Sequence, residues 1–425
     1  MPTYFRRLRL TAATALVAGL VAGTFVSHNA SAAEALSASQ DFRQAIEQAK
    51  GQVSGGYLDA AASSLAALRP ATPLEKYMAA SLAMEIAVKK RDVVAQRAVI
   101  AKIIESGAAP AGQLARLNYI AGYLSYRTGA IDNAIVYLSR ARTLGESDPK
   151  ASLLLVESYA RQRNLNDAAK ILDETIATQI KSGAAVPASW YDRAASFAYA
   201  RKDWASLSAA NAAKLGNASA SSPEWRTAIT SYIVGAKPEP EAELDLHRLQ
   251  AATGAMASER DYQGYAALAA GQGYAAEAKA VIEAGQEKGA LAKGDPIAAQ
   301  LMRSLRGKAI TELAAIKPLP GKSATAASGA KAASGGDDLL ANSLFTEAVP
   351  YYRAALEKGG VDRSRVSTRL GIALARSGDF DGARTALAQV TGRWSEVAAF
   401  WMAWANARSA ALAATVLPGQ SADQT

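Results

Sequence analysis

The chain has 425 residues, a formal net charge of +9, no cysteine and two histidines. Its length allows more than one hydrophobic core. The lack of cysteine excludes disulfides, and with so few histidines it also excludes the usual His/Cys zinc site and Cys–His or multi-histidine catalysis. We therefore expect no cofactor and no metal. Half of the residues are hydrophobic, many of them alanine, and this composition favours helix almost everywhere.

The N-terminus has the pattern of a secretory signal. Three arginines among the first nine residues precede an apolar run at 10–26, and the sequence ASA at 30–32 has the form of a cleavage site. We predict a signal peptide at 1–32, cleaved near Ala32/Ala33, and a periplasmic or secreted protein without stable membrane insertion after cleavage. A retained anchor stays open as the alternative, although the apolar run is marginal for a membrane span.

Removal of the signal leaves 44 basic and 38 acidic residues, a formal net charge of +6. The basic residues are scattered between acidic ones, without a basic arm or interleaved aromatic residues. We therefore expect no nucleic acid partner. The charge suits an exported protein that meets acidic surfaces.

Apolar periodicity and turn residues predict a series of helix pairs. In chain order they are 41–50 with 57–68, 74–89 with 92–105, 113–128 with 131–144, 151–162 with 165–180, 190–200 with 204–215, 224–234 with 241–252, and 261–270 with 275–287. A single helix is expected at 297–316. Four more helices are expected at 344–358, 364–377, 380–390 and 395–412.

Residues 317–336 interrupt this pattern. They are rich in Pro, Gly, Ser and Ala and contain few large apolar side chains, which is typical of a linker or a long surface loop. The sequence thus predicts an N-terminal helical solenoid at 33–316, C-terminal repeats with a capping helix at 337–412, and a flexible tail at 413–425.

A unit of about 34 residues recurs, most clearly at 115–148 and 149–182. Ala134 and Ala168 hold the same place in these two copies. Each helix is amphipathic, so each pair buries its apolar face only against its neighbours. We expect Gly122 on the first helix of one unit to lie against Ala134 on the second.

Several places in the unit recur across the chain. The eighth place is mostly small (Gly122, Val156, Ala195, Ala266, Gly371), the twentieth is Ala134, Ala168, Ala278 or Ala383, and the twenty-fourth is bulky (Leu138, Leu172, Ile282, Leu387). This pattern resembles the tetratricopeptide repeat (TPR), a 34-residue helix pair. The resemblance implies an all-α, right-handed superhelical solenoid of helix-turn-helix repeats. Leu207 and Lys214 depart from the pattern, and an unrelated helical solenoid stays open.

The resemblance also implies a concave groove lined by five places of each first helix. In the last full unit these are Arg365, Thr368, Ile372, Ala375 and Arg376. In the two clearest units, the groove residues that we expect to bind a partner are Arg116, Tyr119, Tyr123, Tyr126, Arg127, Lys150, Glu157 and Arg161. Tyr and Arg are enriched at interface hot spots. Core packing of Tyr119 and Tyr126 is the open alternative.

The tryptophans have simpler interpretations. We expect Trp190 and Trp204 to brace a weak repeat from the core. On the last helix, Phe400 and Trp404 are four residues apart and should point inward together. Trp401 lies on an adjacent strip, where partial exposure and a docking or dimerisation role are the alternative.

Catalytic motifs are incomplete. The run Gly321-Lys322-Ser323 lacks the earlier glycine of a phosphate-binding loop, and Ser328 to Lys331 lacks the companions of its motif. We therefore expect a non-catalytic periplasmic scaffold that binds protein partners of the cell envelope through its concave groove. The alternative is a glycan- or peptidoglycan-associated helical scaffold of a cell-wall or polysaccharide export system. A third hypothesis is an enzyme whose carboxylates need no local motif.

Overall fold

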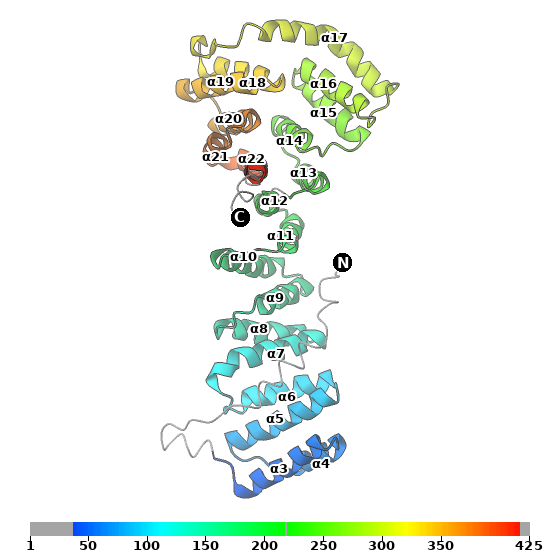
Figure 1. Ribbon diagram of the computed structural model, residues 1–425, viewed down its shortest axis with the longest axis vertical. Helices are drawn as coiled ribbons and strands as arrows, with labels where there is room; N and C mark the ends of the chain where they lie inside the picture. The colour runs from blue at the N-terminus through cyan, green and yellow to red at the C-terminus, as the bar shows by residue number, and fades with distance from the viewer. Residues whose placement is uncertain (1–36, 217–218, 417–425) are drawn as a thin grey trace, which may run out of the picture. The chain divides into compact units, whose positions relative to one another are not determined.

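The computed structural model describes residues 37–216 and 219–416 (Figure 1). The predicted signal peptide and residues 417–425 of the predicted tail lie outside these described residues. Within the described ranges every regular element is a helix, and the helices follow one another in pairs. The expectation of an all-α fold built from helical repeats is therefore confirmed.

The chain forms two compact units, which divide between Ala185 and Val186. In unit 1, consecutive helices pack as neighbours. Its helices are α3 (Gln40–Ser54), α4 (Leu58–Ala67), α5 (Pro73–Lys89), α6 (Val93–Glu105), α7 (Leu114–Arg127), α8 (Ile131–Thr143), α9 (Pro149–Arg161) and α10 (Leu165–Lys181).

Unit 2 holds the remaining α-helices and short 3₁₀ helices at Ser323–Thr325 and Gly392–Trp394. Its helices are α11 (Ala188–Arg201), α12 (Trp204–Leu215), α13 (Ser222–Ala236), α14 (Pro240–Ala252), α15 (Glu259–Gly271), α16 (Ala275–Glu287), α17 (Pro296–Ile316), α18 (Gly329–Ala341), α19 (Phe345–Lys358), α20 (Arg363–Ser377), α21 (Phe380–Leu387) and α22 (Ser395–Val416). Helix α22 therefore continues four residues into the segment that was expected to be a flexible tail.

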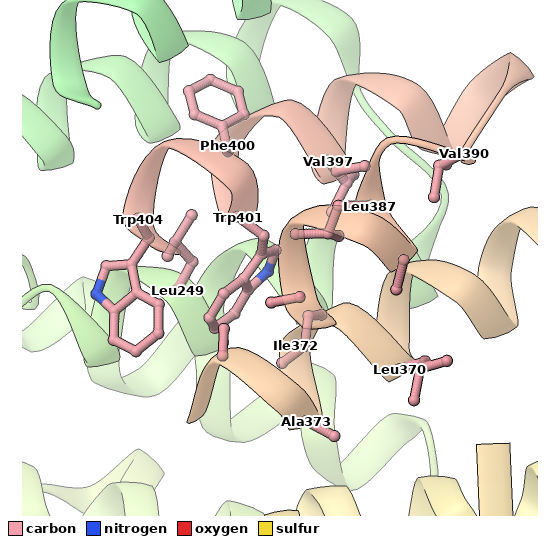
Figure 2. Close-up of a cluster of buried hydrophobic side chains, with 14 of the residues drawn as sticks. Leu249, Leu370, Ile372, Ala373, Leu387, Val390, Val397, Phe400, Trp401 and Trp404 are labelled. Atoms are coloured by element: carbon pink, nitrogen blue, oxygen red, sulfur yellow. The ribbon is translucent and has the colours of Figure 1, made fainter. Parts of the chain in front are cut away.

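Unit 2 closes on itself. Helix α22 packs against α12, α14 and α20, so the last helix of the unit meets helices that come much earlier in the chain. One hydrophobic core joins side chains such as Leu249 of α14 to Ile372 of α20 and Trp401 of α22 (Figure 2). The segment after residue 336 thus shares its core with residues before 316, and the structure does not divide at the expected place.

The interpretation of 317–336 as a linker is wrong for its last eight residues, which form the first two turns of α18. Gly335 and Gly336 are buried beneath two rings of α19. A Cβ on Gly335 would lie 2.6 Å from Cε1 of Tyr351, and one on Gly336 would lie 2.9 Å from Cε1 of Tyr352. The apolar surface that this segment lacks is supplied by the next helix, which the composition of the segment alone could not show.

Inside the repeats, a small residue on the first helix receives a leucine from the second. A Cβ on Gly122 would lie 2.5 Å from Cγ of Leu138. Gly371 faces Leu387 in the same way, with Cδ2 2.6 Å from the position of an added Cβ. Gly122 therefore contacts Leu138 most closely, where Ala134 had been expected. The alanines at the twentieth place are fully buried in all four copies named above, namely Ala134, Ala168, Ala278 and Ala383.

The tryptophans mostly lie in the core. Trp190, Phe400 and Trp404 are buried as expected, whereas Trp204 is only partly buried. Trp401 is 0% exposed, and its Nε1 donates a hydrogen bond to the backbone oxygen of Asp245 at 3.0 Å. The docking role considered for Trp401 is therefore wrong, because the ring is enclosed between α14, α20 and α22.

The glycine–leucine contacts give a test of the packing. Gly371→Ala should lower the free energy of unfolding by about 1–2 kcal/mol, because overpacking against Leu387 exceeds the gain in helix propensity. Gly264 lies in the middle of α15 with nothing near its missing Cβ, so Gly264→Ala should instead raise stability by up to about 1 kcal/mol. Urea unfolding of the two variants measures both effects, and equal stability would contradict this packing.

Candidate functional site

The eight expected partner-binding residues lie on two neighbouring helices of unit 1. Five belong to α7 and three to α9. These helices contact each other directly, and Tyr119, Tyr123 and Tyr126 belong to or border the core cluster that includes Ala151 and Leu154 of α9. We refer to these eight residues as the arginine–tyrosine face: Arg116, Tyr119, Tyr123, Tyr126, Arg127, Lys150, Glu157 and Arg161.

An arginine side chain lies next to the ring of each tyrosine of this face. The guanidinium carbon of Arg116 lies 4.8 Å from the ring centre of Tyr119, and that of Arg161 lies 4.0 Å from the ring centre of Tyr126. Arg127 lies 5.8 Å from the ring centre of Tyr123, and its Nη1 donates a hydrogen bond to the Tyr123 hydroxyl at 3.0 Å. Cation–π contact holds the three planar cations in defined orientations.

The arginines differ in what else they contact. Arg116 is partly buried and lies 3.5 Å from Glu146 and 3.7 Å from Asp148, so its charge is balanced within the unit. Arg127, Arg161 and Lys150 are exposed. Glu157 is partly buried on the same helix as Lys150. The accessible part of the face is therefore cationic, with half-buried tyrosine rings beneath the guanidinium groups.

Tyr119 was expected to line the groove, but it lies in the core. Its ring is only 8% exposed and belongs to the core between α7 and α9. Burial, followed by the charge of Asp148, raises the pKa of Tyr119 to about 12. The side chain is thus a neutral core group covered by Arg116. Tyr123 and Tyr126 are half-buried and keep an accessible edge.

The equivalent face of α20 in unit 2 is covered. Thr368, Ile372 and Ala375, which were expected to line a groove, are at most 2% exposed. Helices α14 and α22 of the same unit account for this burial through the shared core. The resemblance implied an open groove at both places, and at α20 this expectation is wrong because the chain's own helices occupy the face.

A cluster of buried charges joins the helices around this covered face, and sequence reasoning missed it. Arg369 of α20 donates from Nε to Asp245 of α14 at 3.0 Å, and its Nη1 lies 2.9 Å from Asp337 of α18. Asp337 also accepts hydrogen bonds from Arg365 at 2.8 Å and from the Tyr352 hydroxyl at 2.9 Å.

The same cluster continues into α16. Arg248 donates to Asp245 at 2.7 Å and makes two parallel bonds to Glu277, at 2.7 Å and 2.6 Å. The Tyr265 hydroxyl donates to Glu277 at 2.7 Å. We call the six ionised residues the buried charge cluster: Asp245, Glu277, Asp337, Arg248, Arg365 and Arg369. Three acidic and three basic groups balance, which is what burial of charge requires.

This balance assigns a structural role to the cluster. Burial alone would raise the pKa of Asp337, but Arg369 and Arg365 outweigh it and hold that pKa below its ordinary value. A carboxylate held ionised by two arginines is a poor general acid or base. No local pattern reveals the cluster, since Arg369 and Asp245 are 124 positions apart.

Unit 1 also contains a hollow of about 740 Å³ between α4, α5 and α6. Alanine is the most frequent residue in its walls, as at Ala66, Ala83 and Ala95, and Lys76 and Lys102 are among the polar residues. None of the arginine–tyrosine face lines it. Among the described residues, no set of three side chains suited to bind a metal comes together, and no helix has the length and hydropathy that a membrane crossing requires.

The fold is that of a helical-repeat protein, and the arginine–tyrosine face gives α7 and α9 a cationic surface with aromatic rings. The family model of the tetratricopeptide repeat matches residues 335–391 and 368–414. These matches begin in α18 and end in α22, and they include the last two residues of the segment that was interpreted as a linker. Residues 335–414 therefore match tetratricopeptide repeats, and the remaining described residues share with them an architecture of helices. No curated protein sequence matches the chain.

Similar solved structures include the complex of the TPR2AB domain of yeast Sti1 with pHSP90, at 15% identity over 69% of this chain and 99% of that chain, with a TM-score of 0.19. The APC/C hetero-tetramer Cut9–Hcn1 matches at 12% identity over 89% and 97%, with a TM-score of 0.21. Naa15/Naa10 bound to HypK-THB matches at 11% identity over 82% and 63%, with a TM-score of 0.20. Such low scores give no information on the arrangement or the partners of this chain.

A carboxyl next to the buried charge cluster has an unusual pKa. Burial, then the charges of Asp337 and Glu312, raise the pKa of Asp338 to about 6. For an acid, a raised pKa means that the folded state prefers the protonated form. Ionisation of Asp338 therefore costs stability progressively as pH rises from about 4 to about 6, and the cost persists above that range.

Asp338→Asn should accordingly stabilise unit 2 above pH 7 and leave its stability unchanged below about pH 4. Because Asp338 is partly exposed, solvent screening limits the gain to about 1–2 kcal/mol. Thermal unfolding at pH 4 and pH 8 measures it. Asp381→Asn, at an exposed position of α21, is the control and should shift stability by less than about 0.5 kcal/mol at either pH. A pH-independent gain for Asp338→Asn would contradict this account.

Proposed function

We propose that the protein is a non-catalytic scaffold of the cell envelope that binds a protein partner through the arginine–tyrosine face of unit 1. The observation that carries this proposal is the stacking of accessible arginines on half-buried tyrosine rings. Arg127 and Arg161 are exposed but already oriented, so a partner orders them at little further cost in side-chain entropy.

The chemistry of the face favours an acidic, extended segment of the partner. A guanidinium group donates two parallel hydrogen bonds to a carboxylate, and Arg127 and Arg161 offer two such groups on two adjacent helices. The exposed ammonium group of Lys150 adds a third positive charge. The accessible edges of Tyr123 and Tyr126 add apolar contact beside the charges. Both residue types are common among the few side chains that dominate binding energy.

The proposed location is the periplasm. Its support is the N-terminal sequence, in which basic residues, an apolar run and ASA at 30–32 follow one another as in a signal peptide. Under this proposal the protein isolated from a periplasmic fraction begins at Ala33. A chain that begins at Met1 and is found in the cytosol would contradict the location while leaving the binding face untested.

Capture from envelope extract tests the binding face. The variant Arg127→Gln/Arg161→Gln should bind its partner at least tenfold more weakly than the unchanged chain, because two oriented cations at a hot spot contribute about 2 kcal/mol or more. Quantitative capture followed by mass spectrometry measures the loss. Since both side chains are exposed, the fold should be retained, and circular dichroism checks this.

The matched control is Arg140→Gln, which removes an exposed arginine from the second helix of the same repeat, α8. It should leave capture unchanged. If both variants capture every partner as well as the unchanged chain does, this face is not the binding site. Capture of protease-treated cell wall through the same residues would instead support the glycan-binding alternative.

A further inference from the structure

The positive charge of unit 2 is concentrated in residues 288–322, which contain α17 and the loops on either side of it. Helix α17 runs beside α16 (Figure 1). Its inner stripe, with Leu305, Ala309 and Ile316, is buried. The opposite side of this 21-residue helix is exposed, so its outer residues set what it presents to the surroundings.

All of the basic residues in 288–322 are exposed: Lys288, Lys293, Arg303, Arg306, Lys308 and Lys317, together with Lys322. None of them forms an ion pair with another described residue. The expectation that basic residues are scattered between acidic ones is therefore wrong for this part of the surface.

The two acidic residues of the segment point inward. Asp295 is 9% exposed and accepts hydrogen bonds from the backbone nitrogen of Ala298 at 2.6 Å and from Gln263 at 3.2 Å. Glu312 accepts from the backbone nitrogen of Ala276 at 2.9 Å and from Asn342 at 3.0 Å. The carboxylates that would neutralise the segment are thus engaged in holding α17 to its neighbours.

One outer stripe of α17 combines charge with exposed apolar groups. Arg303, Arg306, Ile310, Leu313 and Lys317 follow one another at intervals of three and four residues, which places them on one face of the helix. Ile310 is 66% exposed and Leu313 is 53% exposed. Two large aliphatic groups between cations suit a partner that is both anionic and apolar.

We propose that this stripe of α17 binds the surface of an anionic phospholipid bilayer. In this arrangement the helix lies along the interface, Ile310 and Leu313 enter the acyl boundary, and the arginine and lysine side chains contact the phosphate groups. The occupant is inferred from charge complementarity together with the apolar pair. A flat interface also fits a stripe that is exposed from Arg303 to Lys317 along the helix.

Other polyanions fit less well. Nucleic acid would match the charges but leave Ile310 and Leu313 without apolar contact. Free phosphate would do the same. The binding is expected to be peripheral and weak, because each cation near a charged membrane contributes about 1 kcal/mol and only two aliphatic side chains insert.

Vesicle cosedimentation tests the proposal with the exported form of the chain, beginning at Ala33, so that the apolar run at 10–26 cannot itself enter the bilayer. Vesicles of phosphatidylglycerol and phosphatidylcholine should bind the protein, and vesicles of phosphatidylcholine alone should not. Arg303→Gln/Arg306→Gln should weaken binding by about thirtyfold. Ile310→Gln/Leu313→Gln should weaken it by about tenfold.

Matched controls come from exposed positions of unit 2 outside α17. Arg353→Gln/Arg408→Gln removes two exposed cations, and Val234→Gln removes an aliphatic side chain that is 61% exposed. Both should bind vesicles as the unchanged chain does. The proposal is overturned if neutral vesicles bind equally well, if the controls weaken binding as much as the α17 variants, or if Ile310→Gln/Leu313→Gln has no effect. In the last case duplex DNA or poly-glutamate binding through the arginines would identify a general polyanion surface.

Discussion

The buried ion pair between Arg369 and Asp245 ties together the helices that cover the inner face of α20. Arg369 projects from α20, on the side that a tetratricopeptide repeat usually keeps for a ligand, and Asp245 belongs to a helix more than a hundred residues earlier. Removal of either partner would leave an uncompensated buried charge, which is costly. Side chains of α14 and α22 share a core with the inner side of α20, so unit 2 does not offer there the groove that the repeats imply.

The two units therefore use the same repeat geometry in different ways. Places that hold Tyr123, Tyr126 and Arg127 in unit 1 hold Ile372, Ala375 and Arg376 in unit 2. In unit 1 these side chains leave cations and ring edges accessible, and in unit 2 the first two are enclosed in a core. Within unit 2, six charged groups of balanced sign lie around the covered face of α20, whereas α17 carries unbalanced cations on its outside.

Sequence reasoning succeeded where the determining contacts are local. Gly122 and Leu138 are sixteen residues apart, and so are Gly371 and Leu387, so a periodic pattern could identify both helix pairs. It failed where a distant helix supplies the missing partner. The glycines at 335 and 336 look like linker residues until Tyr351 and Tyr352 pack on them, and Trp401 looks exposed until α14 and α20 enclose it. The groove on α7 and α9 stays a prediction, and the burial of Tyr119 could not be predicted because it depends on how α9 packs against α7.

Closure of the inner face of α20 is most directly tested by cysteine accessibility, since the chain has no native cysteine. Thr368→Cys places a thiol at a position that is 0% exposed, and Ser377→Cys places one at an exposed position of the same helix. In the native protein, Ser377→Cys should react with a maleimide at nearly the rate of the unfolded chain, and Thr368→Cys at least about a hundredfold more slowly until urea unfolds unit 2. Equal labelling of the two thiols without urea would show an open groove at α20 and contradict the account.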